Sequence, residues 1–235
     1  MNPAYAIRNI DTVLSPALVF YKDLIRHNIA EVIRLAGSAA KLRPHVKTHK
    51  TREIARMELE AGITKHKSAP LAEAEMLAQA GAPDVLIAYP IVGPNCQRLA
   101  NLIKKYPQTR FSALVDHPKA LAALGSVMVS NGLVLDTLVD LNVGQNRTGI
   151  PPGDAAAALY EQLTKTPGLR ADGFHVYDCH NHQEGSDERQ KAVDSLLAPV
   201  FTLRKQLEAK GLPVPRLVCG GTPTFPIWAK MDFPG

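Results

Sequence analysis

Short apolar segments of strand type alternate with amphipathic helical segments along almost the whole chain. Residues 17–21 (ALVFY), for example, are rich in residues that favour strands, and residues 22–36 then place apolar side chains at helical spacing. The same order repeats down the sequence. A chain that alternates in this way is expected to form a mostly parallel sheet whose strands are linked by helices.

The pattern predicts eight strands, at residues 17–21, 42–47, 66–69, 85–88, 110–115, 133–143, 169–177 and 216–219. It predicts helices at residues 22–36, 53–61, 71–80, 95–105, 118–131, 154–164 and 187–210. These units in 235 residues favour a (β/α)8 TIM barrel, while an open doubly wound sheet remains the alternative because strand order is not visible in a sequence. Residues 220–235 contain three prolines, so we expect either a short helical turn or an unfinished final element there.

Composition indicates a folded protein rather than a disordered or fibrous one, because 46% of the residues are hydrophobic and 21% are charged. No stretch approaches the roughly 18 consecutive apolar residues of a membrane-spanning helix, and the N-terminal residues lack the pattern of a signal peptide. The cysteines, Cys96, Cys179 and Cys219, form no CxxC motif, so we expect reduced thiols. These features predict a cytoplasmic protein with no membrane partner.

The densest group of chemically active side chains lies at residues 41–52, with five cations and two histidines in twelve residues. If residues 42–47 form a strand, Arg43, His45 and Lys47 share one face, near the carboxyl end where TIM-barrel enzymes place catalytic groups. A lysine held among other cations in a partly dry cleft has a lowered pKa, and its free amine can attack a carbonyl carbon. The group could instead bind phosphate, line a nucleic-acid groove or form a solvated basic edge, and the net charge of +5 does not decide between these.

Three further clusters follow predicted strands. The segment 219–224 (CGGTPT) can present backbone N–H groups and hydroxyls to an anion, although a simple turn has the same composition. Arg147 lies in a polar segment between two glycines and could donate to an anionic ligand. Residues 174–182 contain three histidines, of which His180 and His182 match no strong zinc template. Because all of these clusters lie at the carboxyl ends of predicted strands, a shared cleft is predicted.

Four segments carry a closer identification: residues 43–50 (RPHVKTHK), 146–149 (NRTG), 177–180 (YDCH) and 220–224 (GGTPT). In this order they closely resemble the D-threonine aldolase and D-serine dehydratase family, which belongs to the alanine racemase-like, fold type III enzymes that use pyridoxal 5′-phosphate (PLP). The resemblance covers nearly the whole chain and implies one PLP-binding TIM barrel of the alanine racemase N-terminal type over residues 1–235.

The chain departs from the family's pattern at two positions, one inside these segments and one close to them. Asn142 stands where the family usually has an aspartate, and Cys179 stands where the YDGH pattern has glycine. Both changes are compatible with the resemblance, although Cys179 could crowd the cleft.

The resemblance also implies roles for individual residues. Lys47, rather than Lys50, would form the internal Schiff base (aldimine) with PLP and move protons at the substrate's Cα, with Tyr177, His45 and His180 as the other catalytic residues. The loop after the last strand would bind the cofactor's phosphate, and Arg147 would lie near its phenolic oxygen. The cofactor-binding residues implied in this way are Lys47, Arg147, Tyr177, Gly220, Gly221 and Thr222.

Members of this family cleave or dehydrate D-configured β-hydroxy amino acids such as D-threonine, D-serine or 3-hydroxyaspartate. The resemblance therefore implies a PLP-dependent lyase with a small D-amino acid substrate. Family enzymes also use a divalent metal (Mn, Mg, Zn or Co), held by His and Cys of a C-terminal β-domain that completes a homodimeric active site. That β-domain is absent from residues 1–235, so no metal ligand is predicted within them.

Other interpretations stay open. A single-domain, non-catalytic PLP-binding protein that manages PLP, or an inactive truncated lyase, would use the same barrel. A nucleic-acid surface is disfavoured, because residues 41–52 contain no Phe, Tyr or Trp that could stack on bases. We therefore expect no nucleic-acid partner.

Overall fold

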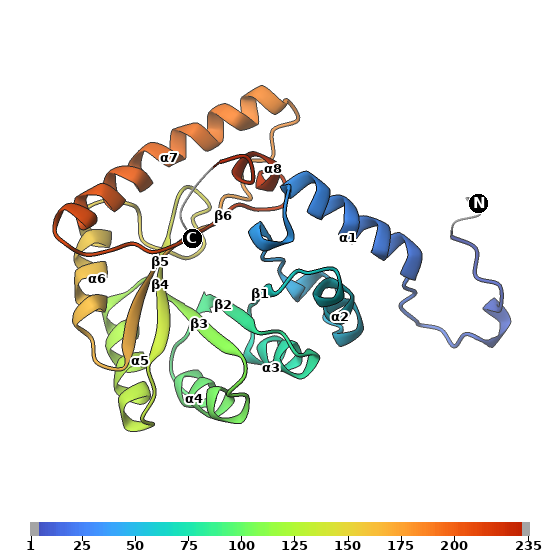
Figure 1. Ribbon diagram of the computed structural model, residues 1–235, viewed down its shortest axis with the longest axis horizontal. Helices are drawn as coiled ribbons and strands as arrows, with labels where there is room; N and C mark the ends of the chain where they lie inside the picture. The colour runs from blue at the N-terminus through green and yellow to red at the C-terminus, as the bar shows by residue number, and fades with distance from the viewer. Residues whose placement is uncertain (1–4, 232–235) are drawn as a thin grey trace.

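The computed structural model describes residues 5–231, in which six parallel strands form one sheet in the order β1-β2-β3-β4-β5-β6 (Figure 1). The strands are β1 (Lys65–Ser68), β2 (Asp84–Pro90), β3 (Arg110–Val115), β4 (Leu135–Leu141), β5 (Leu169–Val176) and β6 (Leu217–Cys219). The helices are α1 (Lys22–Ala36), α2 (Arg52–Glu60), α3 (Leu71–Ala80), α4 (Asn95–Lys105), α5 (Pro118–Ser130), α6 (Asp154–Lys165), α7 (Ser186–Ala209) and α8 (Phe225–Trp228). The 3₁₀ turns are η2 (Ile10–Thr12), η3 (Ala39–Lys41) and η4 (Val46–Thr48).

The sheet is curled rather than flat. Neighbouring strands lie about 4.8 Å apart, so β1 and β5, four positions apart, would be about 19 Å apart in a flat sheet. Yet the Lys67 Nζ of β1 lies 3.3 Å from the His175 Nε2 of β5. A second contact across the inside joins Arg216, just before β6, to Ser112 of β3 at 3.2 Å. The expected parallel α/β architecture is therefore confirmed, but within the described residues the sheet is a half-barrel of six strands rather than a closed barrel of eight, because β6 does not pair with β1.

Two of the eight predicted strands are not strands. Residues 17–21 are irregular, and their apolar side chains find no neighbouring strand to pair with; Leu18 is 86% exposed. Residues 42–47 make only a single bridge, between His45 and Lys67 of β1. Pro44 has no N–H to donate to a ladder, and the chain turns into η4 directly afterwards. The segment thus lies beside β1, although it is not a strand.

Helices cover the outer face of the curled sheet, as Figure 1 shows for α3, α4, α5 and α6. The main hydrophobic core lies between these helices and the sheet, and it includes Leu99, Leu121, Tyr160 and Phe174. The predicted helices at residues 22–36, 71–80 and 95–105 are confirmed without a change of bounds. A short helix, α8, occupies the place where the prolines had predicted a helical turn.

Three levels of side chains fill the interior. At the amino ends of the strands lies a network of ion pairs, whose members are Arg43, Asp84, Arg110, Asp136, Arg170, Asp172 and Arg216. Next comes a small apolar cluster of Leu86, Leu114, Leu138 and Val218. Polar side chains return at the carboxyl ends, with Lys67, Asp140 and His175. The arginines and aspartates of the first level pair with one another, although the buried Arg216 Nε has no hydrogen-bond partner among the described residues.

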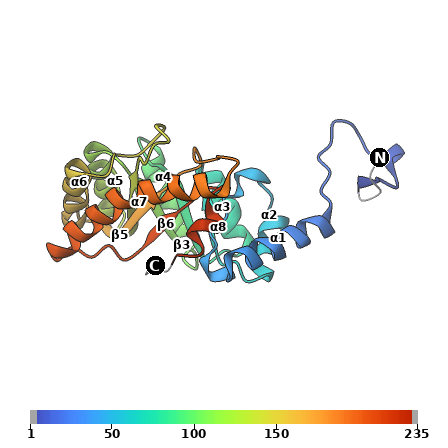
Figure 2. The same cartoon turned by 90° about the horizontal axis from the view of Figure 1, so that it is seen from above.

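The first described segment, residues 5–21, extends away from the rest of the molecule beyond the start of α1, as both views show (Figures 1 and 2). Several of its large apolar side chains are exposed, including Leu14 at 88%. Within residues 5–231, none of the helices is long and apolar enough to span a membrane.

Candidate active site

A cavity of about 930 Å³ runs along the inside of the curled sheet, from the ion-pair network at the amino ends of the strands to the carboxyl ends of β1, β5 and β6. Most of the predicted site residues line it, although they come from distant parts of the chain: His45, Lys47, Arg147, Tyr177, Gly220, Gly221 and Thr222. They converge because the carboxyl ends of parallel strands lie at the same end of the curled sheet. The predicted shared cleft is therefore present.

Tyr177, directly after β5, lies at the centre of this group. The Lys47 Nζ is 5.6 Å from the centre of its ring and the Arg147 guanidinium carbon is 5.3 Å away. The Lys67 Nζ also approaches the ring, at 5.8 Å. Burial raises the pKa of the Tyr177 phenol to about 12, so the ring stays neutral and attracts cations by its π-electrons.

The two lysines of the KTHK segment have different surroundings. The Lys47 side chain faces the cavity, and among residues 5–231 no carboxylate pairs with it. Lys50 has a φ of 51°, in the left-handed region, and its Nζ forms an ion pair with the Glu73 carboxylate outside the cavity. An amine that is already paired in this way is a poor nucleophile, so the geometry favours Lys47.

His45 begins the turn that carries Lys47. Its Nδ1 accepts a hydrogen bond from the backbone N–H of Lys47 at 3.1 Å and thereby caps η4. Burial, followed by the positive charge of Lys47, lowers the pKa of His45 to about 4. His45 is therefore neutral near pH 7, with Nδ1 as acceptor and Nε2 carrying the proton.

The loop after β6 is fixed by the buried carboxylate of Asp178. One oxygen accepts from the Gly221 N–H at 2.9 Å and from the Thr224 hydroxyl at 2.7 Å. The other accepts from the indole N–H of Trp228 at 2.9 Å. Asp178 thus joins the segment after β5 to the segment between β6 and α8.

Some hydrogen-bond donors of this loop are already used within the protein, and only the others could bind an anion. The Gly220 N–H donates to the Val176 carbonyl at 3.0 Å, and the Gly221 N–H is used by Asp178. Thr222 is exposed, and within the described chain its backbone N–H and hydroxyl have no hydrogen-bond partner. Thr222 is therefore the donor of the loop that is free to bind phosphate.

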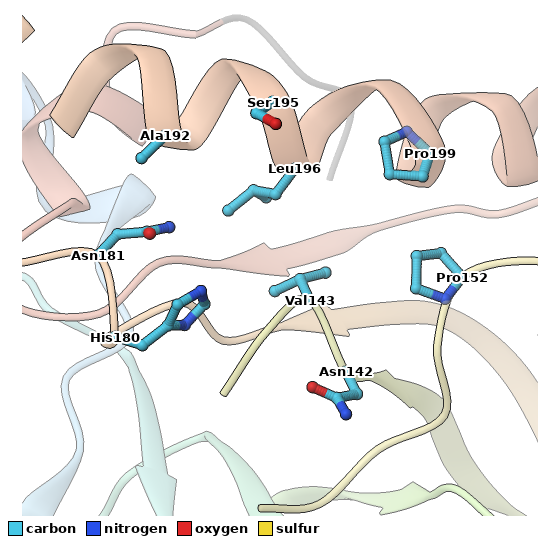
Figure 3. A pocket seen from close by; sticks show the side chains of 9 residues that line it. All are labelled: Asn142, Val143, Pro152, His180, Asn181, Ala192, Ser195, Leu196 and Pro199. Atoms are coloured by element: carbon cyan, nitrogen blue, oxygen red, sulfur yellow. The ribbon is translucent and has the colours of Figure 1, made fainter. Parts of the chain in front are cut away.

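His180, predicted as a catalytic residue, does not line this cavity. It lies in a second cavity of about 460 Å³ between α7 and the loops after β4 and β5, as Figure 3 shows. A Cβ on Gly144 would come within 2.6 Å of the His180 Nε2, so the ring packs directly against that glycine. The structure brings the other predicted catalytic residues together but leaves His180 apart from them.

Sequence reasoning missed a buried chain of three polar side chains next to Tyr177. The Lys67 Nζ lies 3.3 Å from the His175 Nε2, and the His175 Nδ1 lies 2.6 Å from the Asp140 carboxylate. His175 lies two residues before Tyr177 and therefore shares a face of the strand with it, a pattern that could have revealed His175. Lys67 gave no such signal, since its neighbours Lys65 and His66 make the strand look like a solvated basic segment.

Among residues 5–231, no three His, Cys, Asp or Glu side chains lie close enough together to hold a metal ion. The described residues therefore do not fit a metal site, and no chemical step is assigned to a metal.

Comparison with known proteins places the chain in a family. Residues 22–233 match the family described as the alanine racemase N-terminal domain. The chain is 30% identical over 182 residues to a D-threonine aldolase from Arthrobacter sp., an alignment that covers 77% of this chain and 48% of that protein. It is 26% identical over 230 residues to a 3-hydroxy-D-aspartate aldolase from Paracoccus denitrificans, covering 93% of this chain and 57% of that protein.

Solved structures give the same result. A D-threonine aldolase from Filomicrobium marinum superposes with a TM-score of 0.84 at 30% identity, covering 92% of this chain and 59% of that one. A D-threo-3-hydroxyaspartate dehydratase from Delftia sp. HT23 gives a TM-score of 0.77 at 25% identity, covering 91% and 57%. The chain thus spans about half to three-fifths of the length of these relatives.

Proposed function

The chain belongs to the alanine racemase N-terminal domain family, and from this premise we propose that it is the cofactor-binding part of a PLP-dependent lyase acting on D-configured β-hydroxy amino acids. The names of its relatives, a D-threonine aldolase and a 3-hydroxy-D-aspartate aldolase among them, support this substrate class. The curled parallel sheet supports a TIM barrel of the alanine racemase N-terminal type, and we propose that the whole enzyme works as a homodimer.

The residues around the larger cavity fit PLP. A volume of about 930 Å³ is within the range of cofactor pockets. Lys47 offers an amine for the cofactor's aldehyde, Thr222 offers free donors for its phosphate, and Arg147 offers a cation for its phenolic oxygen. The observation that carries the proposal is the Lys47 amine, which faces the cavity beside Tyr177 without a carboxylate partner among the described residues.

When bound, PLP supplies an electron sink for the substrate's Cα. The residues of the chain would bind and orient the cofactor and the substrate. The Lys47 amine would hold the cofactor and could accept or return a proton at the substrate's Cα. The neutral His45, hydrogen-bonded to the Lys47 backbone through Nδ1, fixes the turn and presents an N–H at Nε2. Tyr177 provides a neutral aromatic face between the cations.

The proposal is tested by PLP binding to Lys47→Ala, with Lys50→Ala as the matched control from the same segment. The wild type and Lys50→Ala should both develop the visible absorbance of a bound, borohydride-sensitive PLP, and Lys47→Ala should not. Equal absorbance in Lys47→Ala would contradict the assignment.

A second stage of the same experiment tests the lyase activity. PLP-loaded protein is assayed with D-threonine and D-serine in the presence of a divalent metal. Product formation supports the lyase. PLP binding without turnover supports a non-catalytic PLP-binding protein or an inactive truncated lyase.

A further inference from the structure

Lys67 is a buried cation in the cofactor cavity that the roles above leave unused. Its side chain comes from β1, is 7% exposed and lines the same cavity as Lys47 and Arg147. Both lysine amines lie at similar distances from the Tyr177 ring, 5.6 Å for Lys47 and 5.8 Å for Lys67. The cavity therefore holds two amines at one aromatic ring.

The side chains of His175 and Asp140 fix the position of the Lys67 amine. The Asp140 carboxylate is 2.6 Å from the His175 Nδ1 and also accepts from the Thr148 hydroxyl at 2.8 Å. Because the carboxylate binds the proton on Nδ1, the neutral ring presents the bare Nε2 to Lys67. Lys67 thus donates one N–H to His175, and its other two N–H groups are left for the cavity.

No carboxylate of the described chain neutralises this cation directly. Asp140 lies behind His175. Asp178 is occupied by the loop after β6, and Glu73 pairs with Lys50. A buried ammonium without a counter-ion is costly, so an arrangement that keeps one in a cavity points to an anionic ligand.

Binding of PLP would use only some of the cations that line the cavity. In the proposed function, Lys47 binds the cofactor's aldehyde, Arg147 its phenolic oxygen and Thr222 its phosphate. Lys67 remains, in the same cavity as Lys47 and at a similar distance from the Tyr177 ring. Every amino acid substrate would bring a carboxylate into that cavity, attached to the carbon that bears its amino group.

We propose that Lys67 binds the α-carboxylate of the amino acid substrate and that His175 and Asp140 hold it in place for this role. The inference rests on the proposed function, since it presumes that PLP occupies the cavity. It makes Lys67 a substrate-binding residue, with His175 and Asp140 as positioning residues behind it.

The test compares two amines that differ only in the carboxylate, D-serine and ethanolamine. Each is titrated into PLP-loaded protein, and binding is followed by the change in the cofactor's absorbance as the ligand amine displaces Lys47. One charge-assisted hydrogen bond corresponds to about a 10- to 100-fold preference for D-serine in the wild type. In Lys67→Met the preference should fall to within about threefold.

Two further variants keep the test decisive. Lys67→Gln retains a donor toward His175 without the charge, so it should lose the preference even if Lys67→Met does not fold. Lys65→Met removes a lysine two residues earlier on the same strand, beside the ion-pair network at the amino ends, and should keep the wild-type preference.

Two results would overturn the inference while the proposed function stands. One is a wild-type protein that binds PLP but prefers D-serine no more than ethanolamine. The other is a Lys67→Gln variant with the full wild-type preference. Failure of the wild type to bind PLP at all would overturn the proposed function, and this inference with it.

Discussion

Thr222 and Thr224, two residues apart in the loop after β6, have different surroundings. Thr222 is exposed with free donors, whereas the buried Thr224 hydroxyl donates to Asp178 at 2.7 Å. We expect Thr222→Ala to weaken PLP binding by about 1.5 to 3 kcal/mol, the contribution of one hydrogen bond to a charged group, with little change in stability. Equilibrium titration with PLP measures this, and unchanged affinity would count against a phosphate role for the Thr222 hydroxyl.

Thr224→Val is the matched control, because it removes the hydroxyl from a buried carboxylate. It should lower the free energy of unfolding by about 1 to 3 kcal/mol. Urea unfolding of both variants separates a binding role at Thr222 from a structural role at Thr224.

Lys67 should make the free energy of unfolding depend on pH. Burial, followed by the charge of Arg43 and opposed by Cys219 and Asp140, lowers the pKa of Lys67 from 10.5 to about 8. Between pH 8 and 10.5 the unfolded chain keeps a proton that the folded protein has released, so folding becomes more favourable as pH rises. Relative to Lys67→Met, the wild type should gain up to about 3 kcal/mol between pH 7 and pH 10.

Urea unfolding of both proteins at the two pH values measures this gain, and titrations common to both cancel in the difference. A difference in unfolding free energy that is constant, or that falls with pH, would show that the Lys67 ammonium is not destabilised by burial.

For individual residues, the sequence could predict those that belong to a recognisable segment or that follow the two-residue alternation of a strand. Lys47, Arg147 and Tyr177 were predicted in this way, and the structure brings them to one cavity. Lys67 was missed because its proximity to His175 depends on the curl of the sheet, which joins residues 108 positions apart in the chain. His180 was predicted as a catalytic residue together with Tyr177, but it lies in the second cavity, against α7.

Among the elements, β5 packs tightly at Gly173 against the backbone just before β6. Its φ of +114° is in the region that favours glycine, and a Cβ there would collide with the Arg216 backbone. We expect Gly173→Ala to lower the free energy of unfolding by about 2 to 4 kcal/mol, because either the strand pairing or the backbone must shift.

Gly185→Ala is the control for this substitution, since its φ of −70° suits any residue and a Cβ there comes no closer than 3.5 Å to its neighbours. It should lower the free energy of unfolding by less than about 1 kcal/mol, because alanine is a poorer N-cap than glycine. Equal effects of the two substitutions in urea unfolding would mean that β5 and β6 are not as close as the structure indicates.

The elements themselves were largely predictable, because helix ends and buried strands leave local signals. Gly37 and Gly81, both with positive φ, end α1 and α3 where the sequence placed the ends. Residues 42–47 failed as a strand because Pro44 has no N–H for the ladder with β1, whereas residues 17–21 failed for a non-local reason. A strand exists only where a neighbour accepts its hydrogen bonds, and apolar composition does not reveal whether that neighbour is present.

For the whole molecule, the exposed segment before α1 should contribute little to stability. Residues 5–20 extend from the body and expose Leu14, Leu18 and Phe20. Deleting the first 20 residues leaves Tyr21 as the N-cap of α1 and should change the free energy of unfolding by less than about 1 kcal/mol. It should also reduce self-association, because exposed apolar side chains promote contacts between molecules.

Urea unfolding and sedimentation velocity of the shortened and full chains check these two expectations. A large loss of stability in the shortened chain would mean that the segment packs on the body in solution.

The central claim is that the cavity at the carboxyl ends of the strands binds PLP through Lys47. The most direct measurement incubates the purified 235-residue protein with PLP, reduces it with borohydride and maps the modified peptide by mass spectrometry. We expect one pyridoxyl group, on Lys47. A group on Lys50 or Lys67 instead, or no modified lysine at all, would contradict it.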